Sequence, residues 1–249
     1  MDISLKINKS QDPHHIAIKN ISSVFKKKWL TSYDYKKQKP IHYQSQQAPG
    51  HLFTAQTIKP VLYLTKLTHA ALYEDHNLVS SFLKKDDFAW KEVLKHNKNG
   101  GLCIYASVLL YYLLLASNEI SKNKLSFMQG YYHHEFHDQH ILKNMHQNGL
   151  FGLHSYILFD GYIIDTTIHQ IAFDFYPGEH REFNFIGETT GGINLYGFKE
   201  TNKTVHKYAK RFARESNMTV EEWIDYHTST MNEYTSNQIS LLNNKRTLD

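Results

Sequence analysis

The stretch that decides the fold is 99-NGGLCIYASVLLYYLLLA-116, which contains the most apolar part of the chain. Its segment Leu102–Ala116 is shorter than the roughly 20 residues that a helix needs to span a bilayer, and it contains a serine and three tyrosines. A helix that is apolar on nearly every side belongs in the centre of a globular core. We therefore expect a buried central helix and no membrane span.

The hydrophobic periodicity on either side of this segment predicts helices before it and strands after it. Two helices are expected before it, one within 58–83 that starts after Pro60 and one over 88–94. After it, the pattern predicts strands over 125–132, 153–159 and 162–167, aromatic-rich pieces at 171–176 and 182–186, and closing helices over 203–215 and 220–242. This order predicts an α+β fold, with the central helix packed on an antiparallel sheet and extra helices at both ends.

Composition excludes several classes of protein. The 249 residues include 41% hydrophobic and 14% aromatic side chains, too many for a disordered chain and enough for one large or two small domains. A single cysteine excludes an intramolecular disulfide and any metal site built on paired cysteines. No basic stretch leads into an apolar run at the start, so we expect a cytoplasmic protein, although a substrate of signal-less export would look the same.

Positive charge is concentrated at the N-terminus. Residues 1–40 hold nine lysines and three aspartates, and the polar stretch 36–50 contains two prolines. We expect residues 1–50 to be a basic segment and linker that could favour an acidic partner, and residues 51–249 to be the main domain. Nucleic acid is not expected as a partner, because the helix predicted from 220 begins with acidic residues that would repel phosphate.

The only cysteine, Cys103, follows two glycines at the predicted start of the central helix. Unpaired backbone N–H groups and the positive end of the helix dipole favour a thiolate at such a position. The same N–H groups could hold the oxyanion that forms when a thiolate attacks a carbonyl. A lone cysteine in an apolar helix is also a common core residue, so Cys103 needs a base to be a candidate nucleophile.

A predicted hairpin supplies that base. Asp160-Gly161 is a preferred two-residue turn, and it places Tyr156 opposite Asp165. Because side chains alternate along a strand, His154 shares a face with Tyr156 and has Asp165 as its diagonal neighbour, about 7–8 Å away at the backbone. An imidazole and a carboxylate can bridge that gap. The alternatives are a structural histidine and an aspartate that only starts a turn.

Cys103, His154 and Asp165 together supply a nucleophile, its base and the group that fixes the tautomer of the base. The side chains of Asn97 and Asn99 are candidate donors to the oxyanion, although asparagine before glycine is also a common turn residue. Tyr156 is a further candidate for substrate binding on the face of His154.

These motifs resemble a known family. Gly-Gly-Leu-Cys103 at the start of an apolar helix, Gly130-Tyr131 at the end of a strand, and the run from His154 through Gly161 to Asp165 are similar to the transglutaminase-like branch of the papain-fold cysteine enzymes. The run Asn-Gly-Gly-Leu-Cys is also similar to the active-site opening of arylamine N-acetyltransferases. The resemblance covers residues 90–170 and implies a papain-like core with Cys103, His154 and Asp165 as the catalytic triad.

On this interpretation Cys103 attacks an amide, ester or thioester carbonyl of a peptide, a protein or a small molecule, and an acyl-enzyme forms. Water then gives hydrolysis or deamidation, and an amine gives transfer. No cofactor is expected. The histidine-rich segment 133–146 does not match the helical two-histidine zinc motif, so we expect a polar, pH-responsive loop rather than a metal site. The alternative function is a binding module that keeps the papain-like fold without using the triad.

Overall fold

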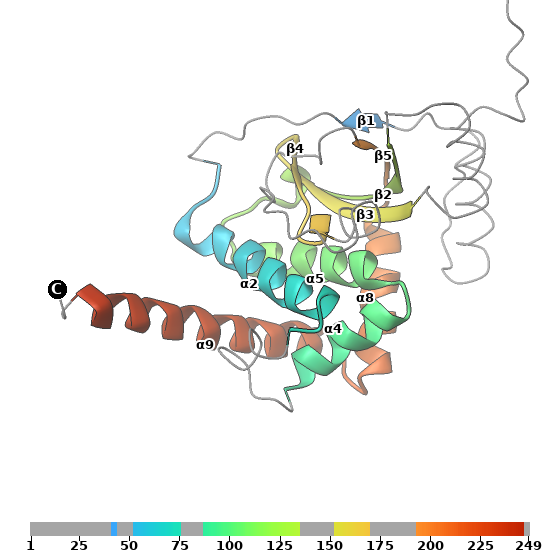
Figure 1. The fold of residues 1–249 in the computed structure, drawn as a ribbon. Coiled ribbons are helices and arrows are strands. Elements are labelled where there is room, and N and C mark those ends of the chain that lie inside the picture. The colour runs from blue at the N-terminus through green and yellow to red at the C-terminus, as the bar shows by residue number, and fades with distance from the viewer. Residues whose placement is uncertain (1–40, 44–51, 76–86, 135–151, 170–192, 247–249) are drawn as a thin grey trace, which may run out of the picture.

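The apolar segment forms helix α5 (Leu102–Ala116) of the computed structural model, with the predicted bounds. The structure describes residues 41–43, 52–75, 87–134, 152–169 and 193–246. Within them, the chain forms five helices and an antiparallel sheet, so the predicted α+β class is confirmed (Figure 1). The other elements are β1 (Ile41–Tyr43), α2 (Ala55–Leu72), α4 (Phe88–Lys98), the 3-10 turn η1 (Lys122–Lys124), β2 (Leu125–His134), β3 (Gly152–Phe159), β4 (Tyr162–Ile164), β5 (Ile193–Lys199), α8 (Asn202–Glu215) and α9 (Val220–Arg246).

The strands follow the order β1-β5-β2-β3-β4, and every neighbouring pair is antiparallel. The β3–β4 hairpin has the predicted register, with Ile157 opposite Ile164. Asp160 and Gly161 form its turn with φ values of 51° and 88°. Two successive positive φ values are typical of the type I′ turn, whose twist matches that of the flanking strands. The predicted hairpin is therefore confirmed.

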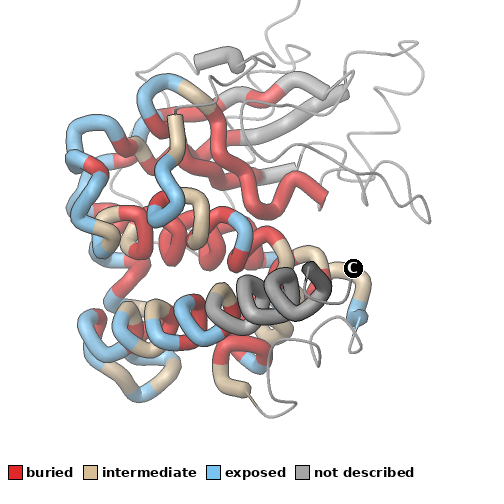
Figure 2. The backbone as a smooth tube through the Cα atoms, turned by 90° about the vertical axis from the view of Figure 1, so that its left-hand side faces the viewer, coloured by how far each residue is buried: buried red, intermediate tan, exposed pale blue. Residues whose placement is uncertain are grey.

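Helix α5 is central because its neighbours surround it. It contacts β2 and β3 on one side and the other four described helices around the rest of its circumference. Figure 1 shows it between the sheet and α9, and Figure 2 shows that burial is concentrated along it and along the adjoining strands. Every second residue of the strands faces the helices, and among these residues Phe127, Ile157 and Phe198 join the main hydrophobic core. A second, smaller apolar cluster forms on the opposite face around Met128 and Tyr156.

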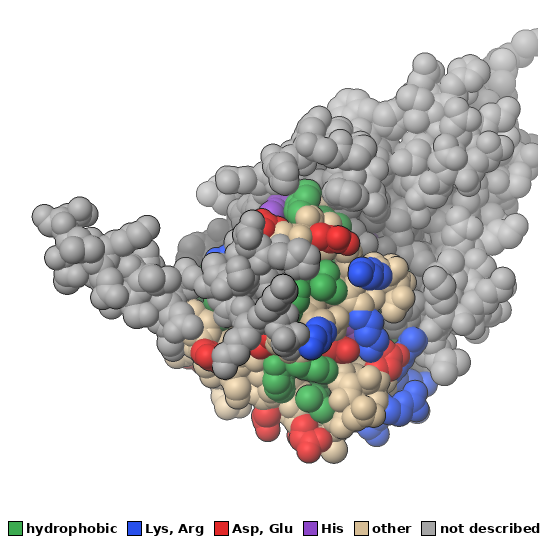
Figure 3. Space-filling model, turned by 60° about the horizontal axis from the view of Figure 1, so that its bottom comes forward, with side chains coloured by type: hydrophobic (Ala, Val, Ile, Leu, Met, Phe, Trp, Pro, Cys, Tyr) green, Lys and Arg blue, Asp and Glu red, His purple; other side chains and the backbone are tan. Residues whose placement is uncertain are grey.

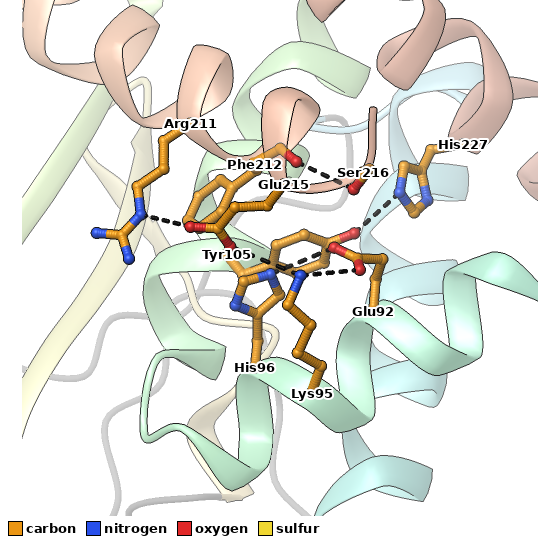
Figure 4. Close-up of polar contacts among 9 residues, drawn as sticks. All are labelled: Glu92, Lys95, His96, Tyr105, Arg211, Phe212, Glu215, Ser216 and His227. Atoms are coloured by element: carbon orange, nitrogen blue, oxygen red, sulfur yellow. Dashed lines mark hydrogen bonds and ion pairs between the residues drawn. The ribbon is translucent and has the colours of Figure 1, made fainter. Parts of the chain in front are cut away.

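A polar layer ties the helices together beneath α5 (Figure 4). The ring of His96 in α4 stacks on Tyr105 in α5 at 4.3 Å, and the Tyr105 hydroxyl lies 2.9 Å from Nε2 of His227 in α9. Lys95 joins Glu92 of its own helix to Glu215 at the end of α8. This layer holds α4, α8 and α9 against the helix that carries Cys103.

Several predicted bounds need correction. Helix α2 begins before Pro60 and ends at Leu72, so the prediction of a helix to residue 83 is wrong over 73–75. There Glu74 takes a φ of 50°, and the N–H of Asp75 turns back to the carbonyl of Ala70 at 2.9 Å. The last predicted strand is shorter than expected and ends at Ile164. The pieces expected at 171–176 and 182–186 lie outside the described residues.

Two strands were not predicted. The expected linker 36–50 contains β1, which pairs with β5 at the end of the sheet. Strand β5 itself pairs with the central strand β2 over seven residues. Neither has a strong pattern of its own, because β1 is three residues long and β5 is interrupted by Gly197.

In the part of the chain that the structure describes, no helix has the length and hydropathy needed to cross a membrane.

Candidate active site

Cys103 lies in the first turn of α5, directly after the turn that joins α4 to α5. Gly100 in this turn has a φ of 65°, a left-handed conformation that glycine adopts without strain. The N–H groups of Gly100 and Gly101 cap α4 by donating to the carbonyls of Asn97 and His96 at 3.0 and 2.9 Å. The two glycines thus end one helix and let the next begin, which places the thiol among the first N–H groups of α5. Cys103 is 4% exposed.

His154 and Asp165 come together across the hairpin, as the diagonal spacing predicted. Nε2 of His154 lies 2.5 Å from Oδ2 of Asp165, and both side chains are buried. The other carboxylate oxygen, Oδ1, accepts from the backbone N–H and the hydroxyl of Thr167 at 2.9 and 3.0 Å. These bonds fix the carboxylate, which in turn fixes the orientation of the imidazole.

His154 also forms a hydrogen bond with the side chain of Cys103. Since Asp165 occupies Nε2, the nitrogen that remains for the sulfur is Nδ1. Burial lowers the pKa of the His154 imidazole, but the charge and hydrogen bond of Asp165, and then those of Cys103, raise it to about 10. The imidazole is therefore protonated at neutral pH, and a positive charge lies beside the sulfur. The three predicted residues form one connected chain of side chains.

Comparisons of this chain with protein-family models, with curated proteins and with solved structures find no match.

The three other candidate residues have different surroundings. Asn97 and Asn99 precede Cys103 in the sequence, and Tyr156 lies on the same face of the sheet as His154. The Asn97 side chain donates to the carbonyl of Ala71 at 3.0 Å and so joins α4 to α2. Asn99 is exposed and ends α4. Tyr156 is fully buried, and its ring lies 6.3 Å from that of His154 at an interplanar angle of 23°. The amide of Asn97 is thus engaged elsewhere, whereas Tyr156 packs against the candidate base.

A glycine pair explains how the Tyr156 ring fits against the sheet. Gly130 lies opposite His154 on one side and opposite Gly197 on the other. A Cβ atom at Gly197 would lie 2.3 Å from the Tyr156 hydroxyl oxygen. The absence of side chains on this row leaves room for the ring beside His154.

Sequence reasoning missed a buried polar group on the helix-facing side of the sheet. Gln129 on β2 is fully buried, and its Oε1 accepts from the Tyr208 hydroxyl of α8 at 3.1 Å. Burial raises the pKa of Tyr208, and the charges of Glu200 and Cys103 raise it further, so this tyrosine lies within electrostatic reach of the sulfur. Gln129 follows Leu125 and Phe127 at two-residue spacing, which places a polar residue in an otherwise apolar row. That break in the alternation was the available signal.

Metal ligands do not gather in the described part of the chain, where no three His, Cys, Asp or Glu residues are arranged to hold an ion. The histidine-rich segment 133–146 lies outside the described residues from 135 onward, and only the backbone of His133 and His134 is described, as the end of β2. The prediction for this segment therefore stays a prediction.

Proposed function

We propose that this protein is a cysteine-dependent enzyme that transfers or hydrolyses acyl groups with Cys103, His154 and Asp165 as its triad, on a transglutaminase-like, papain-like core. The observation that carries the proposal is the connected chain from sulfur to imidazole to carboxylate at the start of a buried helix. Each member has a physical role in that chemistry.

In the first half of the reaction, the Cys103 thiolate attacks the carbonyl carbon of an amide, ester or thioester. A carbon–sulfur bond forms and the carbonyl electrons move to oxygen, where backbone N–H groups at the start of α5 stabilise the charge. When the carbonyl re-forms, the bond to the leaving group breaks, and Nδ1 of His154 delivers its proton to that group. The product is a thioester on Cys103.

In the second half, His154 takes a proton from water or an amine as that molecule attacks the thioester. The carbon–sulfur bond breaks and the thiolate returns. Asp165 stays ionised throughout and holds the ring through Nε2, so that Nδ1 faces the sulfur. Water gives hydrolysis or deamidation, and an amine gives transfer to a peptide, a protein or a small molecule.

The second candidate is a binding module that retains the fold without using the triad. The observation that favours it is the burial of the site, because Cys103 packs in the main hydrophobic core and His154 is 2% exposed. A nucleophile must be reached by its acyl donor, whereas a structural cysteine need not be.

Alkylation with iodoacetamide at pH 6 and pH 8 separates the two candidates. Cys103 is the only cysteine, so all thiol labelling reports on this site. An enzyme with a thiolate–imidazolium pair should alkylate readily at pH 6 and lose that reactivity in His154→Ala. Slow labelling at pH 6 that is insensitive to the same substitution would support the binding module.

A further inference from the structure

The β3–β4 ladder stops one rung short of the candidate triad. In an antiparallel hairpin with a two-residue turn, hydrogen-bonded and non-hydrogen-bonded pairs alternate away from the turn. Phe159–Tyr162 and Ile157–Ile164 are the hydrogen-bonded pairs of this hairpin. The next such pair would join residues 155 and 166, but β4 ends at Ile164. The carbonyls of Ser155 and Thr166 therefore need other donors.

Helix α5 supplies the donor for the first carbonyl. The hydroxyl of Ser107 donates to the carbonyl oxygen of Ser155 at 2.9 Å, and both residues are buried. Ser107 is one helical turn after Cys103, about 6 Å along the axis, and Ser155 is the neighbour of His154. This bond therefore connects the helix that carries the sulfur to the strand that carries the imidazole. Its donor is one turn from Cys103, and its acceptor is one residue from His154.

Helix α2 supplies the donor for the second carbonyl. The hydroxyl of Thr68 donates to the carbonyl oxygen of Thr166, the residue directly after Asp165, and Thr68 is also buried. Two hydroxyls from two helices thus take the place of the two bonds that a longer β4 would make. The two strands therefore separate beside Asp165, the residue whose carboxylate holds the His154 ring.

Resting on the proposed function, we propose that Ser107 and Thr68 are positioning residues for the triad. They hold the hairpin open beside the start of α5, so that the His154 ring is held by Asp165 on one side and meets Cys103 on the other. Neither residue takes part in bond making. Their contribution is the distance between sulfur and imidazole, which sets how strongly the imidazolium stabilises the thiolate.

The test compares Ser107→Ala and Thr68→Val with variants that lose a hydroxyl elsewhere in the same kind of element. Ser117→Ala removes a hydroxyl that bonds the Leu114 carbonyl at the end of α5, and Thr228→Val removes one that bonds Ile224 within α9. Ser107→Thr restores a hydroxyl. Far-ultraviolet circular dichroism and urea unfolding establish that each variant is folded before it is compared.

Two readouts are measured for each variant. The first is the rate of Cys103 alkylation by iodoacetamide at pH 6 and at pH 10. The second is the NMR titration of the His154 ring, assigned by its loss in His154→Ala. We expect Ser107→Ala and Thr68→Val each to slow alkylation at pH 6 by about five- to tenfold, the effect of one buried hydrogen bond, with less than twofold change at pH 10. The pKa of His154 should fall in both variants, and Ser107→Thr should recover most of the rate.

The outcomes separate the two proposals. If folded Ser107→Ala and Thr68→Val match the controls in both readouts, the positioning role is wrong whatever the wild-type reactivity. If the wild-type thiol is itself slow at pH 6 while the His154 titration still moves in the two variants, the positioning role stands and the proposed enzyme function fails.

Discussion

Replacing Asp165 by asparagine should invert the tautomer of His154. In the wild type, Oδ2 of Asp165 accepts a hydrogen bond from Nε2 of the ring at 2.5 Å. The asparagine oxygen can keep the two bonds from Thr167, which leaves the NH2 group facing Nε2. That nitrogen must then accept, so the neutral ring carries its proton on Nδ1 and has no lone pair to receive the proton of the thiol.

The magnitude follows from the pKa of His154. The charge of Asp165 is the first of the causes that raise it to about 10, against burial, which lowers it. Without that charge the pKa should fall by several units, and each unit is a factor of ten in the protonation equilibrium. We expect alkylation of Cys103 at pH 6 to slow by about a hundredfold or more in Asp165→Asn.

The assay is iodoacetamide labelling followed by mass spectrometry, from pH 5 to pH 10. Asp160→Asn is the matched control, because Asp160 lies in the same hairpin but is exposed in the turn, where it pairs with Lys124 at 3.2 Å. Its rate should stay within twofold of the wild type. An unchanged rate at pH 6 in folded Asp165→Asn would show that the carboxylate does not govern the His154–Cys103 pair.

Three further predictions concern stability, each measured by urea unfolding. Burial lowers the pKa of His227 to about 3, so the unfolded chain binds a proton below pH 6.5 that the folded chain does not, and this residue should cost about 2 kcal/mol of stability at pH 5 relative to pH 7. His227→Gln should therefore show a weaker loss of stability between pH 7 and pH 5, and an equal loss would contradict the neutral, buried state of this ring. Gly197→Ala should cost about 1–3 kcal/mol because its Cβ meets the Tyr156 hydroxyl, and the cost should shrink in a Tyr156→Phe background. Gly100→Ala should cost about 1–2 kcal/mol from its positive φ alone, since no atom lies within 4 Å of the added Cβ, and Gly100→Asn should cost less.

The sequence predicted best those features that local chemistry determines. An apolar run without a polar face has to be buried, and it became α5 with the expected bounds. Asp160-Gly161 fixed the turn, and the turn fixed the register that brings His154 to Asp165. These steps need only side-chain alternation and the geometry of a two-residue turn.

Features that depend on distant partners were not predicted. Strand β5 has a broken pattern of its own, and its existence depends on pairing with β2. The roles of Ser107 and Thr68 depend on where β4 ends. Their hydroxyls bond carbonyls that lie 48 and 98 residues away along the chain, so no local pattern indicates them. Asn97 was a plausible oxyanion donor by its place before Cys103, but its amide is taken by the carbonyl of Ala71, which no local pattern indicates.

The most direct test of the central claim is to trap the acyl-enzyme. The protein would be mixed with p-nitrophenyl acetate at pH 7, and both the release of nitrophenolate and the mass of the Cys103 peptide would be followed. We predict one acetyl group on Cys103, formed with a burst of nitrophenolate that is lost in Cys103→Ser and strongly slowed in folded His154→Ala. Acetylation that occurs only on other residues, or that proceeds equally fast in His154→Ala, would contradict a nucleophilic role for Cys103 with His154 as its partner.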